Sequence, residues 1–364
     1  MGNEAIKSLI KVWSIIFASL CYCYFISSKL PKGKLRLLSL IPIICLYILL
    51  PLSIYPVLPT GITSFFITWL ASSKLLLFAF DLGPLTVPKG TEKGTKEGSD
   101  VHNLENDREP IKSLFRFMFI AAFPVKGNDQ TTLAKKPTKV IPLNFWSKTL
   151  ISSILITICD RYKIQLHPGV TFVIYCVLLY LLVDLVIDIA NKLVGPLLHV
   201  ELVPPSDEPY MSTSLQDFWG RRWNLMVTDT LRHTVYKPVR VFSSKYVGKD
   251  LALGLAQATS FLVSGLVHEL IFYYMTRVRP SWEVTWFFVL HGVCVVVEVV
   301  VKNGLGRKVR LGRVVTGPLT IGFVMATAYL WFFPPLTRNQ VDIRTIEEFK
   351  TFYGFVKGIF ISDL

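Results

Sequence analysis

Residues 251–276 read LALGLAQATSFLVSGLVHELIFYYMT and contain one histidine, His268, and one acidic residue, Glu269, with no lysine or arginine. A helix that crosses a bilayer needs about 20 predominantly apolar residues. This stretch is long enough and apolar enough to cross, and it decides the fold class. The composition agrees, because 52% of the 364 residues are hydrophobic and only 18% are charged, whereas about 25% are charged in a soluble domain.

Apolar segments of similar length recur along the chain. Seven lie at 12–28, 37–58, 61–80, 168–187, 251–276, 282–301 and 314–335, and a weaker eighth at 143–159 is interrupted by Lys148. The run 114–125 is too short to span. The basic loops 29–36 and 302–313 are expected to face the cytosol, which requires an even number of spans between them. Counting segment 143–159 as a span gives an even number of spans between the two basic loops and puts both termini in the lumen. We therefore expect an all-α integral membrane protein of about eight transmembrane helices with interfacial helices.

The chain is expected to form a single membrane-embedded domain over residues 1–364. Residues 86–112 are polar and have the composition of a disordered cytosolic loop. Residues 188–250 are expected to be cytosolic or interfacial. In 341–360 the apolar residues recur every three or four positions, which predicts an amphipathic helix on the membrane surface.

Several common sites are excluded by their motifs. The six cysteines form no CxxC pair, so no zinc knuckle is predicted. Position 272, where HExxH needs its second histidine, is Phe272, and GxSxG, Walker and complete GxGxxG motifs are missing. The six histidines are scattered, so we expect no metal site and no resident cofactor. The net charge of +14 lies in loops that orient the spans and contact membrane lipids, so we expect no nucleic acid partner.

Ionisable residues within spans are costly and are therefore functional candidates. His268 is the strongest, and the alternative is a structural histidine. Small residues precede it in steps of four, on one helical face, namely Ser264, Ser260, Ala256 and Ala252. This stripe indicates either close helix packing or a slot for a chain-like substrate. His291, in the middle of a later span, is a weaker candidate for substrate contact or for support of the site.

Other polar residues in the spans have structural explanations. Asp184 and Asp188 share a helical face near the end of a span, where Lys192 is available to pair with Asp188. Lys74 is expected to extend its ammonium group toward the cytosolic end of its span.

The segment TSLQDFWGRRWNLMV, residues 213–227, is the second informative stretch. Thr213 and Gln216 fit a capping box, which predicts one helix running onward to Met226. Its aromatic and basic residues suit a membrane interface, so an anchor helix is the plain alternative to a site. Asn224 lies one helical turn after Gly220, so its amide would border bare backbone.

One histidine and one asparagine without a protein nucleophile suit direct acyl transfer. A neutral histidine can take the proton of an alcohol, and an asparagine amide can donate to the developing oxyanion or hold the acceptor hydroxyl. The rival is a transporter in which His268 and His291 relay protons. Such a transporter would show broken helices and inverted repeats, and the sequence displays neither.

Six blocks of the sequence resemble the plant wax synthase-like branch of the membrane-bound O-acyltransferases. They are LIKVW at 9–13, PKGKLRLL at 31–38, FFITWLASSKLLLFAFDLGPL at 65–85, PYMSTSLQDFWGRRWNLMV at 209–227, FLVSGLVHELIFYY at 261–274 and WEVTWFFVLHGVC at 282–294. The resemblance implies a multi-pass enzyme of the endoplasmic reticulum membrane that uses acyl-CoA as co-substrate. It also implies that His268 is the catalytic base and Asn224 its partner.

The resemblance further implies a lipophilic alcohol as acceptor. A long-chain fatty alcohol, giving a wax ester, is favoured, and diacylglycerol with acetyl-CoA or a sterol are the alternatives. Candidate substrate contacts are Trp219, Arg221, Arg222, Trp223, Ser264, Gly265 and His291. The basic residues between 221 and 240 are expected to meet either CoA phosphates or anionic lipid headgroups. The sequence does not indicate an oligomeric state.

Overall fold

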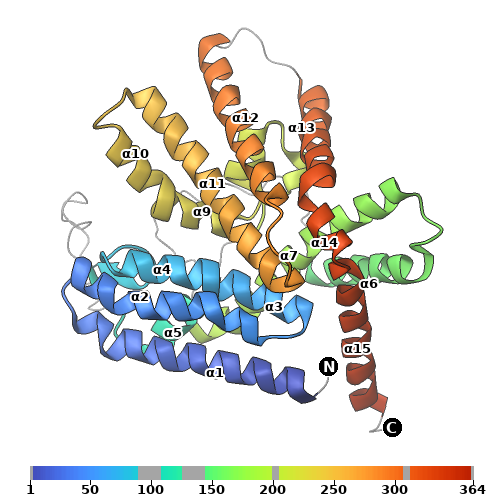
Figure 1. Ribbon diagram of the computed structural model, residues 1–364, viewed down its shortest axis with the longest axis horizontal. Coiled ribbons are helices and arrows are strands. Elements are labelled where there is room, and N and C mark those ends of the chain that lie inside the picture. Colours follow the sequence, from blue (N-terminus) through green and yellow to red (C-terminus); the bar gives the residue numbers. More distant parts are fainter. Residues whose placement is uncertain (1–2, 89–107, 125–143, 199–204, 306–311, 362–364) are drawn as a thin grey trace. The chain divides into compact units, whose positions relative to one another are not determined.

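A computed structural model describes residues 3–88, 108–124, 144–198, 205–305 and 312–361. Nearly all of these residues are helical, which confirms the all-α class, and they group into two compact units that are described separately (Figure 1). One unit contains residues 2–128 and 193–203, and the other contains residues 129–192 and 204–364 together with Met1.

The unit built from 2–128 and 193–203 contains the first predicted spans. Its elements are α1 (Asn3–Phe25), α2 (Lys34–Leu49), α3 (Val57–Ser64), a π-helical segment (Phe65–Ala71), α4 (Ser72–Phe78), β1 (Thr86–Pro88), β2 (Arg108–Pro110) and α5 (Leu114–Ala122), with short 3-10 turns at Ser27–Lys29 and Leu50–Ser53. The segment from α3 to α4 is one continuous helical rod. The two strands pair antiparallel, with Val87 opposite Glu109. They are the ends of the predicted polar loop, whose residues 89–107 lie outside the described part.

Two cations of this unit are buried and hydrogen-bonded to carbonyl oxygens. Arg36, expected in a cytosolic loop, is at the start of α2 and 4% exposed. It pairs with Asp81, and its Nε and Nη2 both donate to the carbonyl oxygen of Leu30. Lys74 is also 4% exposed and donates to the carbonyl oxygens of α5's last residues, Ile120 at 2.7 Å among them. The ammonium group of Lys74 is thus enclosed by protein, because free carbonyls at a helix C-terminus attract its charge. Its direction toward the cytosolic end of the span stays a prediction.

The second unit contains the remaining helices. They are α6 (Phe145–Tyr162), α7 (Pro168–Leu198), α8 (Leu215–Asp217), α9 (Leu225–Leu231), α10 (Lys237–Ser243), α11 (Lys249–Thr276), α12 (Glu283–Leu305), α13 (Arg313–Thr327), α14 (Pro334–Arg338) and α15 (Val341–Ile361). A 3-10 turn covers Pro209–Met211, and π-helical segments cover Phe218–Arg222, Arg232–Tyr236 and Ala328–Phe332. The residues of α7 from Leu193 onward group with the other unit.

Seven helices in the described part are long and apolar enough to cross a membrane. They are Glu4–Lys29, Lys34–Ser53, Val57–Phe78, Pro168–Leu197, Lys249–Thr276, Glu283–Gly304 and Arg313–Arg338. These match the seven stronger predicted segments. The eighth segment, 143–159, corresponds to α6, and this helix carries Lys148, Asp160 and Arg161 and is not among the seven. An eight-span count and lumenal termini stay predictions, whereas α5 is short, as expected.

Lys148 and two aspartates form a buried ion triad between α6 and α7. The Lys148 ammonium lies 2.6 Å from Asp184 and 2.8 Å from Asp188. Lys192, the partner expected for Asp188, instead lies over the ring of Phe145, 3.6 Å from its centroid. The polar face of α7 is thus structural, as predicted, but Lys148 supplies the charge. Lys148, which interrupts the apolar segment 143–159, is therefore also the partner of the two aspartates of α7.

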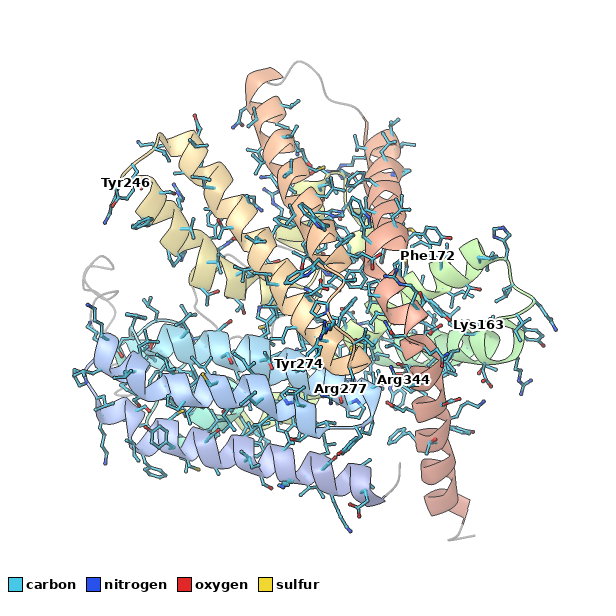
Figure 2. The ribbon with its side chains drawn as sticks, in the orientation of Figure 1. Lys163, Phe172, Tyr246, Tyr274, Arg277 and Arg344 are labelled. Carbon is cyan, nitrogen blue, oxygen red and sulfur yellow. The ribbon has the colours of Figure 1, made fainter. Side chains whose placement is uncertain are left out.

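The tail helix α15 is tied to α6 and α7 at its start. Lys163, labelled in Figure 2, lies 2.6 Å from one carboxylate oxygen of Asp342, and the Tyr175 hydroxyl lies 2.7 Å from the same oxygen. Farther along α15, Lys350 pairs with Asp160 at 2.7 Å. Helix 341–360 therefore exists as predicted. Its position on a membrane surface stays a prediction.

Helices α11 and α12 pack closely along their length. A Cβ atom at Gly265 would lie 3.0 Å from the Cα of Thr285, and one at Gly292 would lie 2.8 Å from the Cβ of Phe261. The glycines thus let the two backbones approach, as small residues do at membrane helix interfaces. A buried aromatic cluster that includes Phe261, Phe287 and Phe288 fills the rest of this interface.

Candidate active site

His268 lies in the C-terminal third of α11, and its ring orientation is fixed by its own helix. The Nδ1 atom is 2.8 Å from the carbonyl oxygen of Ser264. A carbonyl oxygen can only accept, so Nδ1 carries the hydrogen and, in the neutral ring, Nε2 carries the lone pair. The imidazole lies against Phe288, with 4.4 Å between ring centroids, and the residue as a whole is partly exposed. The local fold therefore makes Nε2 the basic atom.

His291 repeats this arrangement in α12 but is completely enclosed. Its Nδ1 is 2.8 Å from the carbonyl oxygen of Phe287, and its Nε2 is 3.4 Å from the hydroxyl of Thr327. The exposed fraction of the residue is 0%. Both nitrogens thus face protein groups, an arrangement that suits a supporting role more than proton exchange with a substrate.

Trp219 brings the second informative stretch to the two histidines. Its ring lies 5.4 Å from His291 and 5.6 Å from Phe288, between centroids, and Phe288 in turn contacts His268. The hydroxyl of Thr228 donates to the Trp219 carbonyl at 2.8 Å. The indole Nε1 is buried and has no hydrogen-bond partner among the described residues. Trp219 and His268 thus lie against Phe288, and His291 lies against Trp219 and Phe287.

The prediction of a single helix from Thr213 to Met226 is wrong, because the helix is interrupted at Trp223 and Asn224. The cap of α8 is Ser214 rather than Thr213, since the Ser214 hydroxyl accepts from the Asp217 amide. A π-helical turn ends at Arg222, Trp223 is extended, and Asn224 is left-handed with φ 40°. Asparagine tolerates this conformation better than most residues, so the residue type and the break go together.

The side chain of Asn224 starts the next helix. Its Oδ1 accepts from the backbone amide of Val227 at 3.2 Å, a standard N-cap of α9. An atom that accepts from an amide must be the oxygen, so this contact also fixes which side of the carboxamide is which. The cap uses Oδ1 and leaves the two Nδ2 hydrogens to donate elsewhere, as the predicted role requires.

The other candidates of this segment have mainly structural contacts. Arg222 donates to the Asp217 carboxylate at 2.9 Å and to the Asp207 carbonyl at 3.1 Å. Trp223 stacks on Phe218 with 5.6 Å between centroids. Of the two arginines, Arg221 is the exposed one. A phosphate contact thus suits Arg221 better than Arg222.

The small residues of α11 are buried. Ala252 and Ala256 are at most 1% exposed, and Ser260 and Ser264 less than 10%. Ser264 holds His268 through its carbonyl, and Gly265 packs on the backbone of α12. These contacts favour packing over a substrate slot, and substrate contact by Ser264 or Gly265 stays a prediction.

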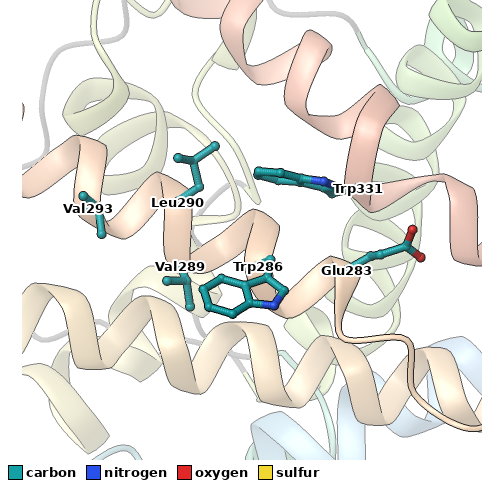
Figure 3. Close-up of a pocket in the computed structure, with 6 residues that line it drawn as sticks. All are labelled: Glu283, Trp286, Val289, Leu290, Val293 and Trp331. Atoms are coloured by element: carbon teal, nitrogen blue, oxygen red, sulfur yellow. The ribbon is translucent and has the colours of Figure 1, made fainter.

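An apolar pocket of about 360 Å³ lies on the other side of α12 (Figure 3). It is lined by Glu283, Trp286, Val289, Leu290, Val293 and Trp331. Trp286 and Val293 are more than half exposed, and this row recurs at helical spacing on the face opposite Phe287, Phe288 and His291. It is therefore an outward-facing hollow and contains none of the predicted site residues. No cluster of three potential metal ligands occurs in the part of the chain that the structure describes.

Two acidic residues support the site and were not predicted to do so. Glu269 is 5% exposed and accepts from the amides of Trp282 and Thr285 and from the Thr285 hydroxyl, so it caps α12. Glu298 accepts from the amide of Leu215 at 2.9 Å and thereby caps α8. The sequence signal for Glu269 and Glu298 is an acidic residue within an apolar run. The helix starts that they cap are distant in sequence, so their partners could not be predicted.

Seven helices that are long and apolar enough to cross a membrane are typical of a multi-pass membrane protein. Comparison with known proteins specifies the class. The profile of the Membrane bound O-acyl transferase family matches residues 203–290, which include Asn224 and His268. The Long-chain-alcohol O-fatty-acyltransferase of Simmondsia chinensis is 40% identical over 98% of this chain and 97% of its own length. The Acyl-CoA–sterol O-acyltransferase 1 of Arabidopsis thaliana is 36% identical over 96% of each chain.

The chain belongs to the membrane-bound O-acyltransferase family. It is therefore an acyltransferase that acts on an alcohol, and the predicted resemblance is confirmed. The same finding favours the enzyme over the transporter with a histidine relay.

Proposed function

We propose that the protein transfers a fatty acyl group from acyl-CoA to a long-chain alcohol and so forms a wax ester. The observation that carries this proposal is the full-length similarity to the Simmondsia chinensis long-chain-alcohol enzyme. The endoplasmic reticulum membrane is the proposed location, and acyl-CoA is a co-substrate in a reaction without a resident cofactor.

His268 acts as the general base in this proposal. Its Nε2 takes the proton of the alcohol hydroxyl, and the oxygen attacks the thioester carbonyl. The tetrahedral intermediate collapses with loss of CoA thiolate, which recovers the proton from the imidazolium, so that ester and free CoA are the products. The Nδ1 contact with Ser264 supports this role because it keeps the lone pair on Nε2.

Asn224 acts on the oxygen that becomes charged. Its Nδ2 donates to the developing oxyanion or to the acceptor hydroxyl. The Val227 cap supports this role, since it holds Oδ1 and so orients the amide. Trp219 lines the same cluster and is the proposed apolar contact for the chain of a substrate.

A sterol is the second candidate acceptor, and it is favoured by the similarity to the Arabidopsis sterol enzyme. An assay of ester formation distinguishes the two acceptors. Microsomes from cells that express the protein are supplied with labelled acyl-CoAs of several chain lengths. Fatty alcohol, sterol and diacylglycerol are tested as acceptors in parallel. Wax ester as the main product is expected. Sterol ester as the main product would move the proposal to the second candidate, and no ester with any pair would overturn it.

A further inference from the structure

The short loop at residues 205–208 holds the backbone on both sides of the helix break at Asn224. The Asp207 amide donates to the Arg222 carbonyl at 2.9 Å, and the Leu225 amide donates to the Pro205 carbonyl at 2.8 Å. The Arg222 guanidinium adds a bond to the Asp207 carbonyl. Residues on each side of the helix break are therefore hydrogen-bonded to the same loop, residues 205–208.

Asn224 needs such support because a left-handed conformation is unfavourable for a residue with a side chain. Its Val227 cap fixes the side chain relative to α9 only. The loop bonds fix the backbone on either side of it. The direction in which the Asn224 amide points is thus set by the position of residues 205–208.

This loop is in turn anchored to α7 by a short hydrogen bond. The Ser206 hydroxyl donates to one carboxylate oxygen of Asp184 at 2.6 Å, while the other oxygen of Asp184 lies 2.6 Å from the Lys148 ammonium. Asp184 is 4% exposed, so its orientation is fixed by these two partners. A charged acceptor makes such a bond stronger than a neutral one.

We propose that Ser206 and Asp184 are positioning residues for Asn224, so that α6 and α7 set the geometry of acyl transfer through the 205–208 loop. The proposal rests on the proposed function of Asn224. Neither residue touches the substrate. Their effect is on turnover, because a misaligned amide still allows both substrates to bind but stabilises the transition state less.

The chain offers a matched control in Asp188. Asp188 pairs with the same lysine, at 2.8 Å, and lies one turn from Asp184 on α7. Its carboxylate is bonded to Lys148 and not to Ser206. Asp188→Asn therefore perturbs the ion triad and leaves the Ser206 anchor in place, whereas Ser206→Ala does the reverse.

The experiment measures ester formation in microsomes at matched amounts of full-length protein. For Ser206→Ala we expect kcat to fall on the order of tenfold with KM for both substrates unchanged. Ser206→Thr, which keeps the hydroxyl, should restore most of the turnover. Asp188→Asn should stay within about twofold of the wild type, because Asp188 is the more exposed of the two aspartates and Lys148 keeps Asp184 as its partner.

A double-mutant cycle separates positioning from a merely structural role. Asn224→Asp keeps an oxygen for the cap but has no hydrogens to donate. In the Asn224→Asp background, Ser206→Ala should lower kcat by less than about twofold, because the side chain at 224 no longer has an N–H group whose direction matters. A full tenfold cost in both backgrounds would overturn the proposal, and if Asn224→Asp leaves no measurable turnover, the threonine rescue decides.

The outcomes also distinguish this inference from the proposed function. A wild-type protein that forms no ester would overturn the proposed function. An active wild type with an equally active Ser206→Ala variant, or a Ser206→Thr variant as impaired as alanine, would overturn only the positioning role.

Discussion

The surroundings of His268 and of His291 are nearly the same in chemistry and differ in access. Both rings donate Nδ1 to the carbonyl four residues earlier, at 2.8 Å in each case, and both lie in the same aromatic cluster. His291, however, is 0% exposed and has the Thr327 hydroxyl at Nε2, whereas His268 is partly exposed.

The Nδ1–H tautomer, which the two histidines share, is therefore not sufficient to make either of them a catalytic base. In both helices the backbone supplies the same Nδ1 acceptor, so Nε2 is basic in both rings. Only a ring with some access can receive a proton from an alcohol and return it. We therefore propose the proton transfer for His268, the residue that is partly exposed, and support of the aromatic cluster for His291.

The largest effect is expected for His268→Ala. Removing a general base typically costs 10²–10⁴-fold in rate, so ester formation should fall by about that factor. The measurement is ester formation in microsomes, with the amount of membrane-inserted protein determined alongside. Substantial activity in a variant that accumulates normally would exclude His268 as the base.

A smaller loss is expected for Asn224→Asp. Aspartate keeps an acceptor for the Val227 amide and tolerates the left-handed backbone, but it cannot donate to an oxyanion. Removing one such donor costs about 10²–10³-fold in kcat. Asn224→Ala is the comparison, because it should also lose about 0.5–2 kcal/mol through the missing cap. Turnover by the aspartate variant equal to that of the wild type would limit Asn224 to its capping role.

These two residues could be found from the sequence, and their geometry could not. A histidine in an apolar run is costly whatever surrounds it, so His268 is visible without a structure. The break at Asn224 depends on bonds to residues 205–208, nearly twenty positions earlier, and local helix signals around Thr213 predict a continuous helix instead. The helical spans were predicted well because they depend only on length and apolarity.

Partners of buried charges were the least predictable feature. For Asp188 the nearby Lys192 is the obvious partner along the sequence, but the structure uses Lys148, forty residues away, because α6 packs on α7. Lys74 is an analogous case, since its acceptors are at the end of α5. Tertiary contacts override spacing wherever a charge is removed from water and must find any partner that packing brings near.

A modest effect on turnover is expected for His291→Phe. Phenylalanine keeps an aromatic ring against Trp219 and Phe287 but loses the Nδ1 hydrogen bond, which is worth about 0.5–1.5 kcal/mol. This corresponds to less than about tenfold. The assay is the one used for His268, with His268→Phe as the matched variant. A loss as large as that of His268→Phe would contradict the division of roles between the two histidines.

The smallest effect on chemistry is expected where α11 meets α12 beside His268. In Gly265→Ala the new methyl would lie 3.0 Å from the Cα and 3.2 Å from the carbonyl oxygen of Thr285. A backbone cannot yield as a flexible side chain can, so the variant should lose about 1–3 kcal/mol of stability. The measurement is the temperature at which ester-forming activity is lost irreversibly.

Gly254→Ala is the matched control on the same helix, since its methyl would meet only a side-chain atom of Val296, at 3.5 Å. That is an ordinary contact, and alanine is the better helix former by about 1 kcal/mol, so its inactivation temperature should be unchanged or higher. If both variants behave alike, the close approach of α12 at Gly265 does not limit the stability of this region. If Gly265→Ala alone is labile and keeps its turnover at low temperature, the contact sets the stability of the His268 region without entering its chemistry.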